Sequence, residues 1–240
     1  MLIKYMAENL LFVSAGDKTE FFKYWIDKER NYKIILCYYG DKPENPYKSY
    51  VDYAFERKGS KFQNFYHLWN TKPEIRNFKN FFIIDDDIII KTIGINRLFG
   101  ILNKYNLWVL QPSFHPRSKL SHKITRKNPK FLLRYVNFIE VTAMMFSNYA
   151  MKRCMEVYDP ILVGWGIDYL FLWHLNFRLT DKFAVVDRIS CVNPKTDEGD
   201  REISKLQKTN VRRQTWEKFR KKNNIFQWKH RTYKAIPLIQ

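Results

Sequence analysis

The chain has 240 residues, of which 45% are hydrophobic and 17% aromatic, so it can bury a substantial core and fits one large domain better than two. Lys and Arg total 42 against 24 Asp and Glu, a net charge of +18, which favours anionic partners such as nucleotide phosphates, anionic lipid or nucleic acid. The three cysteines are odd in number and far apart, and no run of 18 apolar residues occurs, so we expect no disulfide framework, zinc site, signal peptide or membrane span.

The first part of the chain alternates apolar runs with amphipathic ones. A strand is predicted over 10–13, followed by a tight turn at 14–17. An amphipathic helix is predicted over 20–29 and a second buried strand over 33–39. Residues 73–79 are typical of a further helix. Two strands joined by a helix form a βαβ unit, so this half predicts a nucleotide-binding α/β sheet.

Three adjacent acids, Asp85, Asp86 and Asp87, follow the apolar run at 81–84. Adjacent carboxylates repel one another, and burying them unpaired is costly. A divalent cation with a phosphate ligand at the carboxyl end of a buried strand would explain them. In extended backbone Asp85 and Asp87 point the same way and Asp86 points away. Asp85-x-Asp87 is therefore the candidate clamp for metal and nucleotide, with a polar turn after a core strand as the alternative.

After the acids, the pattern predicts a helix over 93–105 and a strand over 107–111. Residues 112–134 are polar and basic, typical of a solvated loop, and include His122 and Arg134.

One long apolar strand is predicted over 135–146, with Glu140 as its single acid. A lone carboxylate in such a strand either pairs with a nearby base such as Arg134 or faces a cleft.

A helix is predicted over 147–157, with Ser147 as its N-cap. The sequence Gly164-Trp165-Gly166 then indicates unusual backbone torsions or close approach to a ligand. Asp168 lies in the first turn of the next helix, where it either favours the helix dipole or serves a site.

The last strand region covers 183–186 and 189–192 and ends at Asn193-Pro194. From residue 201 to 240, twelve Lys and Arg stand against two acids, which indicates a helix and tail outside the core.

Taken together, these segments resemble a family of GT-A-fold glycosyltransferase-like proteins of bacteria, plants and large viruses. The matching pieces follow the order of the family and cover most of residues 9–195. They are NLLFVSAGD (9–17), NYKIILCYYG (31–40), KGSKFQNFYHLW (58–69), FFIIDDDI (81–88), LQPSF (110–114), SHKIT (121–125), LRYVNFIEVTAMMFS (133–147), GWGID (164–168) and VVDRISCVNPK (185–195).

The resemblance implies a single GT-A-type, Rossmann-like α/β domain with a central mixed, mostly parallel sheet flanked by helices. This catalytic domain would span 1–200, with a basic helical extension over 201–240 packed on or trailing it. The implied activity is a metal-dependent, inverting transfer of a hexose or pentose from a nucleotide-diphosphate sugar to a glycan or other hydroxyl acceptor. The implied location is the cytoplasm of a bacterium or of a virus-infected host cell.

The resemblance also implies roles for single residues. The base and ribose of the nucleotide would be held near Gly16 and Asp17, with Asp85 and Asp86 contributing. Manganese or magnesium would be bound by Asp87 and Asp85. The family's last strand usually ends in His-Pro, so Asn193 stands where many GT-A enzymes have a third metal ligand.

On the acceptor side, Asp168 resembles the general base of inverting enzymes, although its place at a helix start is expected to weaken it as a base. Residues that would contact substrate are Glu140, Trp165, Gly166, His122 and Arg134.

Two alternatives stay open. The charge and the aromatic, basic tail would also suit a nucleic-acid-binding protein or a metal-dependent nuclease, although no nucleic-acid motif occurs and no specific nucleic-acid partner is expected. Asn193 would suit a catalytically silent GT-A-like binding module. The tail is further expected to give weak peripheral contact with anionic membranes and to be dispensable for the active site.

Overall fold

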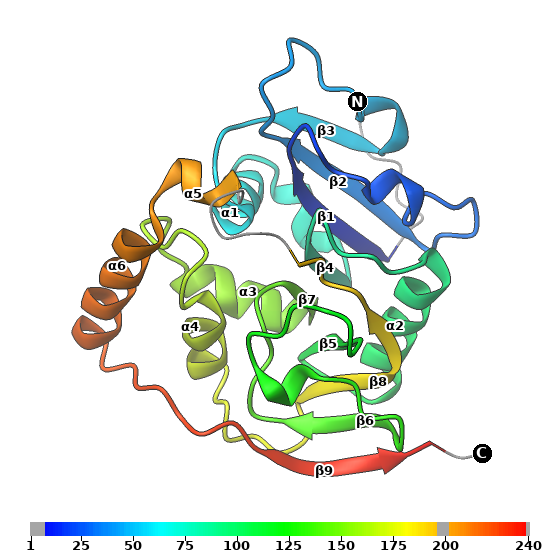
Figure 1. Cartoon of the computed structure of the whole chain (residues 1–240), viewed down its shortest axis with the longest axis vertical. Helices are drawn as coiled ribbons and strands as arrows, with labels where there is room; N and C mark the ends of the chain where they lie inside the picture. The colour runs from blue at the N-terminus through cyan, green and yellow to red at the C-terminus, as the bar shows by residue number, and fades with distance from the viewer. Residues whose placement is uncertain (1–7, 196–201, 239–240) are drawn as a thin grey trace.

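The computed structural model describes residues 8–195 and 202–238, and Figure 1 shows the order of its elements. Its strands are β1 (Asn9–Ala15), β2 (Tyr32–Tyr38), β3 (Tyr53–Glu56), β4 (Asn80–Asp85), β5 (Val109–Phe114), β6 (Phe131–Val136), β7 (Ala143–Ser147), β8 (Phe183–Cys191) and β9 (Thr232–Pro237). Its α-helices are α1 (Lys61–Thr71), α2 (Thr92–Lys104), α3 (Asn148–Val157), α4 (Ile167–His174), α5 (Glu202–Leu206) and α6 (Thr209–Lys222). Its 3-10 turns are η1 (Phe21–Lys23), η2 (Lys48–Tyr50), η3 (Pro73–Asn77) and η4 (Lys123–Thr125).

Within these residues, all nine strands form one mixed sheet in the order β3-β2-β1-β4-β7-β5-β8-β6-β9. The pairings make β6 and β7 run against the other strands. Because each reversed strand lies between two others, four of the eight pairings are antiparallel, so the sheet is mixed as predicted but less parallel than the prediction states. The chain leaves β1 toward β2, and β4 lies on the other side of β1. This topological switch point is where open α/β sheets bind ligands.

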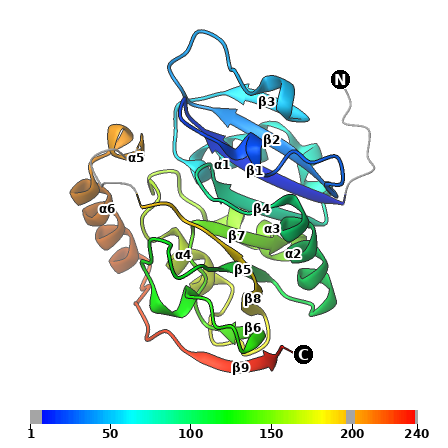
Figure 2. The ribbon, with the colours of Figure 1, turned by 45° about the vertical axis from the view of Figure 1, so that its right-hand side comes forward.

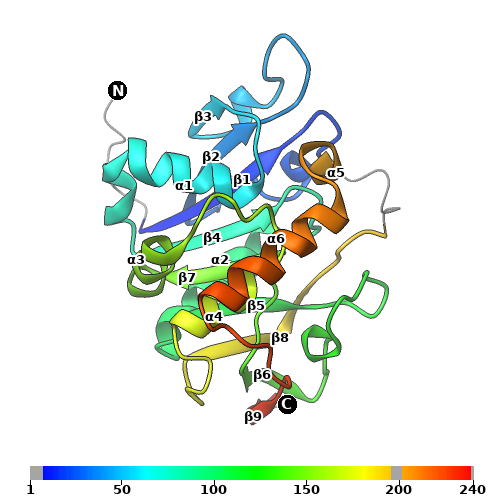
Figure 3. The ribbon, with the colours of Figure 1, turned by 90° about the vertical axis from the view of Figure 1, so that its left-hand side faces the viewer.

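Helices cover both faces of the sheet and make three layers. One core packs α1, α3 and α4 against the sheet, and a second core packs α2 and the segment around Trp25 against the opposite face. Figures 2 and 3 show α6 lying outside α4, away from the sheet. The apolar runs of β1 and β4 are buried because both of their faces are covered.

Most local predictions agree with the structure. The predicted strands at 10–13, 33–39 and 107–111 correspond to β1, β2 and β5, and the predicted helix over 93–105 corresponds to α2. Ser147 caps α3 as predicted, since its hydroxyl accepts a hydrogen bond from the backbone N–H of Ala150. The predicted helix over 73–79 is the 3-10 turn η3.

Two local predictions are wrong. The helix over 20–29 is reduced to η1, because four of its ten residues are aromatic side chains of weak helix propensity and Trp25 is buried in the core instead. The single strand over 135–146 is divided between β6 and β7. Both strands run in the reversed direction, so residues 137–142 must cross the face of the sheet from the end of one strand to the start of the other.

The C-terminal segment contains a strand that the sequence did not predict. β9 pairs with β6 and extends the sheet at its edge, and the chain reaches it by passing along α4 (Figure 1). The predicted boundary between residues 200 and 201 lies outside the described residues. Within the part of the chain that the structure covers, no helix combines the length and apolar character needed to cross a bilayer.

Candidate active site

The candidate site lies at the switch point, where the loops after β1 and β4 meet. The backbone N–H of Gly16 donates to Oδ2 of Asp86 over 3.2 Å, and the Thr19 hydroxyl donates to the carbonyl of Asp86 over 2.8 Å. Thr19 therefore ties the two loops together.

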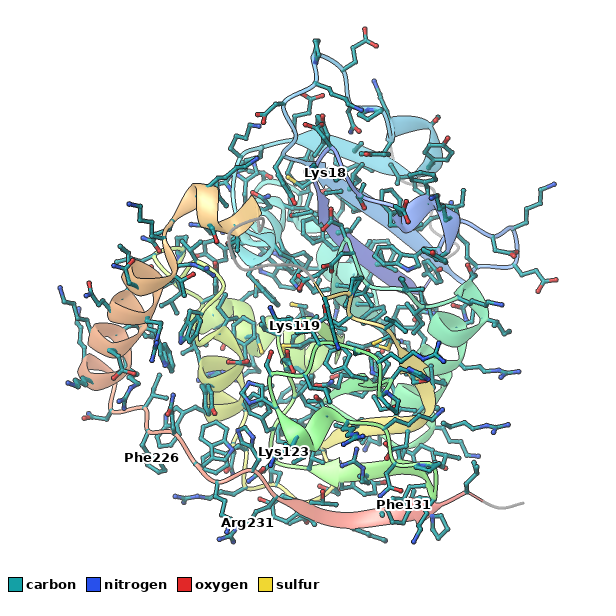
Figure 4. All side chains as sticks on the ribbon, in the orientation of Figure 1. Lys18, Lys119, Lys123, Phe131, Phe226 and Arg231 are labelled. Atoms are coloured by element: carbon teal, nitrogen blue, oxygen red, sulfur yellow. The ribbon has the colours of Figure 1, made fainter. Side chains whose placement is uncertain are left out.

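The acids after β4 form a turn, which changes the predicted orientation of their side chains. The N–H of Ile88 donates to the carbonyl of Asp85 over 3.3 Å, so the backbone is no longer extended after Asp85. Asp86 and Asp87 both line a pocket of about 190 Å³, together with Lys18, which Figure 4 labels. Strand alternation fails here, and the pair that shares a pocket is Asp86 with Asp87.

Asp85 is instead held by Lys61, the first residue of α1. The Lys61 ammonium lies 2.6 Å from Oδ1 of Asp85 and also donates to the carbonyls of Val141 and Thr142, over 2.8 and 3.1 Å. Sequence reasoning did not predict Lys61, because nothing local connects the start of α1 to the acids. This ammonium offsets part of the negative charge at the end of β4 and anchors the residues just before β7.

The surroundings of Asp86 strongly shift the pKa of its carboxyl group. Burial raises the pKa of Asp86 to about 7, and the charges of Asp87 and then Asp85 add to this increase, while the N–H of Gly16 opposes it. Such a site gains from a bound cation, because the cation would relieve both the burial penalty and the repulsion.

Among the described residues, no three His, Cys, Asp or Glu side chains form a ready-made metal site. Magnesium commonly uses one or two carboxylates and completes its shell with substrate phosphates and water. The Asp86 and Asp87 carboxylates fit that pattern.

The end of β8 comes close to the same acids. Ile89 and Val192 exchange two backbone hydrogen bonds of 2.9 Å, which places Pro194 in the wall of the Asp86 pocket. The backbone of Asn193 is fixed by Ser118 Oγ at 3.1 Å and by the N–H of Lys119 at 2.9 Å. The fold thus brings the Asn193-Pro194 segment beside the acids, although they are far apart in sequence.

Glu140 is buried beside the same group of acids. Thr142 donates to its Oε1 over 3.1 Å, Gln111 Oε1 accepts from its N–H over 2.6 Å, and its Oε2 has no hydrogen-bond partner among the described residues. Burial raises the pKa of Glu140 to about 7, with the charge of Asp168 as the next cause. The free Oε2 is an acceptor that a ligand hydroxyl could use.

Asp168 lies in the first turn of α4 and is only 7% exposed. Its Oδ1 accepts from the N–H of Tyr169 over 2.9 Å. The expectation that the helix start weakens this residue as a base is wrong, because burial outweighs the backbone hydrogen bonds and raises the pKa of Asp168 to about 6. A carboxylate with this pKa is ionised at neutral pH and is a stronger base than an ordinary Asp.

Solved structures of S. aureus TarS have a similar fold. S. aureus TarS superposes with a TM-score of 0.55 at 10% identity, over 84% of this chain and 39% of that one. S. aureus TarS 1-349 gives 0.57 at 9% identity, over 89% and 70%. The same protein in complex with UDP-GlcNAc gives 0.52 at 9% identity, over 88% and 65%.

This chain has a glycosyltransferase-like fold. It spans about 39% of the TarS chain, and identities this low show the fold alone. No protein-family model matches the sequence, and the comparison with curated proteins returned no match.

In this glycosyltransferase-like fold, Asp17 holds the loop after β2. The Tyr38 hydroxyl donates to its carboxylate, as does the N–H of Asp41 over 2.9 Å, and the Tyr47 hydroxyl donates to its carbonyl over 2.9 Å. The Tyr38 hydrogen bond is the main reason that the pKa of Asp17 is lowered. Asp17 thus fixes the loop after β2 and lies next to Lys18, which lines the Asp86 pocket.

Arg134 does not reach Glu140. Its guanidinium makes two hydrogen bonds to the buried Asp187, of 2.7 and 3.1 Å, and donates to the carbonyls of Ile124 and Arg126 over 2.9 and 2.8 Å. Of the two alternatives that the sequence left open for Glu140, pairing with Arg134 is therefore excluded, and these contacts make Arg134 a structural anchor for the basic loop.

The two glycines around Trp165 have the unusual torsions that the sequence predicts, with φ of 76° at Gly164 and 77° at Gly166. A Cβ on Gly166 would lie 2.1 Å from the ring of Trp216, and one on Gly164 would lie 2.7 Å from Ile203. The close approach at these glycines is thus made by the C-terminal segment. Trp165 itself is 37% exposed, with the guanidinium of Arg213 5.5 Å from its ring centroid.

His122 lies beside the site among rings that sequence reasoning did not associate with it. Its ring centroid is 4.5 Å from that of Phe138 and 5.1 Å from that of His230, and burial lowers the pKa of His122. His230 belongs to the segment after α6, so its proximity has no local signal in the sequence.

Proposed function

We propose that this protein transfers a sugar from a nucleotide-diphosphate sugar to a hydroxyl of a glycan or similar acceptor. The observation that carries the proposal is the paired Asp86 and Asp87 carboxylates in the pocket at the switch point of a glycosyltransferase-like fold. A solved structure of similar fold was determined in complex with UDP-GlcNAc, which supports a nucleotide sugar as the donor.

On the donor side, Asp86 and Asp87 would hold a manganese or magnesium ion, with Asn193 close enough in the fold to assist. The ion would neutralise charge on the departing diphosphate as a Lewis acid. Gly16 and Asp17 would border the nucleoside. Asp85, neutralised by Lys61, would act mainly by keeping the acidic turn in place.

On the acceptor side, Asp168 would accept the proton of the attacking hydroxyl, in an inverting reaction. A positioned base of this kind contributes about 10²- to 10⁴-fold in rate. Its burial and raised pKa suit the role. Glu140 would accept a hydrogen bond from a substrate hydroxyl at its unpartnered Oε2.

The cations of the C-terminal segment, most of which are exposed, support a weaker, peripheral contact with anionic lipid. Residues 203–238 carry eleven Lys and Arg and one acid, and each cation near an anionic leaflet contributes about 1 kcal/mol. Co-sedimentation with anionic liposomes should fall as salt is raised. Equal sedimentation with anionic and neutral liposomes would contradict the proposed contact with anionic lipid.

A calorimetric screen of nucleoside diphosphates, with and without manganese, tests the main proposal. We expect one diphosphate to bind selectively and more tightly in the presence of the metal. Tight oligonucleotide binding with a steep salt dependence, and no selective nucleotide binding, would favour a nucleic-acid-binding protein instead. Selective binding with no transfer to any acceptor would indicate a silent binding module.

A further inference from the structure

The aromatic residues of the C-terminal segment pack against α4 and the turn that follows it. Tyr169 and Trp173 are spaced four apart on α4, which places their side chains on the same side of the helix, and Phe177 lies in the turn after it. Trp228 stacks on Phe177 with centroids 3.8 Å apart and lies edge-on to Tyr169 at 5.0 Å, while Phe226 lies edge-on to Trp173 at 4.4 Å. Figure 4 labels Phe226 on the run that joins α6 to β9.

A second contact is made at the start of α4. Trp216 of α6 is 1% exposed, and its ring fills the space that any side chain at Gly166 would need. Gly166 is the N-cap of α4, two residues before Asp168. The backbone that leads into Asp168 is therefore fixed from outside by Trp216.

A third contact reaches the residue after Asp168. The Tyr169 hydroxyl and Nε2 of His230 are 3.0 Å apart. The His230 ring also stacks on Phe138, with centroids 4.0 Å apart and an interplanar angle of 19°. Phe138 belongs to the crossing segment 137–142 that carries Glu140, so His230 contacts both sides of the acceptor site.

Asn137, at the start of the crossing segment, holds the same run of C-terminal chain. Its N–H and Nδ2 donate to the carbonyls of Arg231 and Lys229, over 3.1 and 3.0 Å. Its Oδ1 and carbonyl accept from the N–H of Arg231 and the indole of Trp228, over 2.7 and 3.0 Å. The backbone N–H, backbone carbonyl, Oδ1 and Nδ2 of Asn137 therefore all bond to one segment, residues 228–231.

We propose that residues 216–231, here called the C-terminal brace, position Asp168 and Glu140 relative to each other for acceptor activation. This inference rests on the proposed transferase function and assigns the brace a positioning role, with no contact to the reacting atoms. These contacts argue against the expectation that the segment is dispensable for the active site. They are made to α4, which carries Asp168, and to the crossing segment, which carries Glu140. The aromatic residues that alternate with its Lys and Arg are the part of the segment that performs this role.

The test compares Trp216→Leu with Trp108→Leu, a matched change at a Trp that packs on Tyr149 away from the site. For Trp216→Leu we expect kcat for transfer to fall about 10²-fold, as small misplacements of catalytic groups do. The KM for the donor and the nucleotide affinity should stay within twofold of wild type. Hydrogen exchange should show lost protection over 167–174. Trp108→Leu should retain wild-type kcat and wild-type exchange over those residues.

His230→Ala provides the second variant if Trp216→Leu does not fold, and it should show the same split between kcat and donor KM. The positioning role of the brace is refuted if the folded variants match Trp108→Leu in kcat and in hydrogen exchange over 167–174. It is also refuted if the affinity for the donor falls by as large a factor as kcat. Failure of the proposed function has a different signature, since wild-type protein would then bind no nucleotide. In that case exchange over 167–174 still decides whether the brace holds α4.

Discussion

Replacing Glu140 by Gln should make the protein more stable at alkaline pH and change its stability little at acid pH. The isosteric amide keeps an oxygen to accept the Thr142 hydrogen bond and removes the buried charge. Burial raises the pKa of Glu140 from 4.5 to about 7, which corresponds to about 3 kcal/mol at 1.36 kcal/mol per pH unit. The folded state therefore binds the proton more tightly than the unfolded chain does.

The direction in which the free energy of unfolding changes with pH follows from proton linkage. Between the unfolded pKa and the folded pKa, the native state holds more protons than the unfolded state, so the free energy of unfolding falls as pH rises through this window. Wild-type protein should lose about 2 to 3 kcal/mol through Glu140 between pH 5 and pH 8, and Glu140→Gln lacks this loss.

Urea unfolding of both proteins at pH 5 and pH 8 measures the effect. The stability advantage of Glu140→Gln should grow by about 2 to 3 kcal/mol between the two pH values. Glu156→Gln is the control, because Glu156 is an exposed acid paired with Arg153 on α3 and should show little change. An advantage of Glu140→Gln that is equal at both pH values would refute the buried-charge account.

Three further predictions follow from the site. Gly166→Ala should destabilise the protein by more than about 2 kcal/mol in urea unfolding, since a Cβ would lie 2.1 Å from the Trp216 ring at a φ of 77°. Gly100→Ala, in α2 with no atom of the described residues within 4 Å of its Cβ, should instead stabilise by about 0.5 to 1 kcal/mol, and equal effects at the two glycines would contradict a role for packing at Gly166. Asp87→Ala should lose manganese-dependent nucleotide binding in calorimetry without a lower urea midpoint, because it removes a repelling charge, whereas unchanged affinity would exclude Asp87 from the donor site. Asp168→Asn should bind the donor normally and lose about 10²- to 10⁴-fold in transfer rate, and full transfer would remove Asp168 from the role of base.

The sequence predicted the elements whose signals are local. Apolar runs that end in polar turns predicted β1, β2 and β5, and the cap at Ser147 predicted the start of α3. The position of Asp168 in the first turn of α4 was likewise predicted correctly. These features depend on neighbouring residues, which periodicity and capping rules describe well.

The predictions that failed depended on contacts between distant segments. Strand alternation could not reveal the turn after Asp85, which places Asp86 and Asp87 in one pocket. The raised pKa of Asp168 arises from burial, which a helix-dipole argument leaves out.

Charge pairing across the fold was also beyond local rules. Lys61 neutralises Asp85 from another element. Arg134 is committed to Asp187 on a neighbouring strand, so it does not reach Glu140. A buried base pairs with whichever acid the fold brings to it, and the sequence alone does not rank those acids.

Paramagnetic broadening of backbone amides by a manganese nucleoside diphosphate would test the central claim most directly. Manganese relaxes nearby amides, so the titration locates the metal and its ligand in one experiment. We expect the amides of Gly16, Asp87 and Asn193 to broaden first, while those of α6 remain sharp. Broadening that begins on the basic surface of α6, or that leaves the turn after β4 unaffected, would contradict a donor site at the switch point of the sheet.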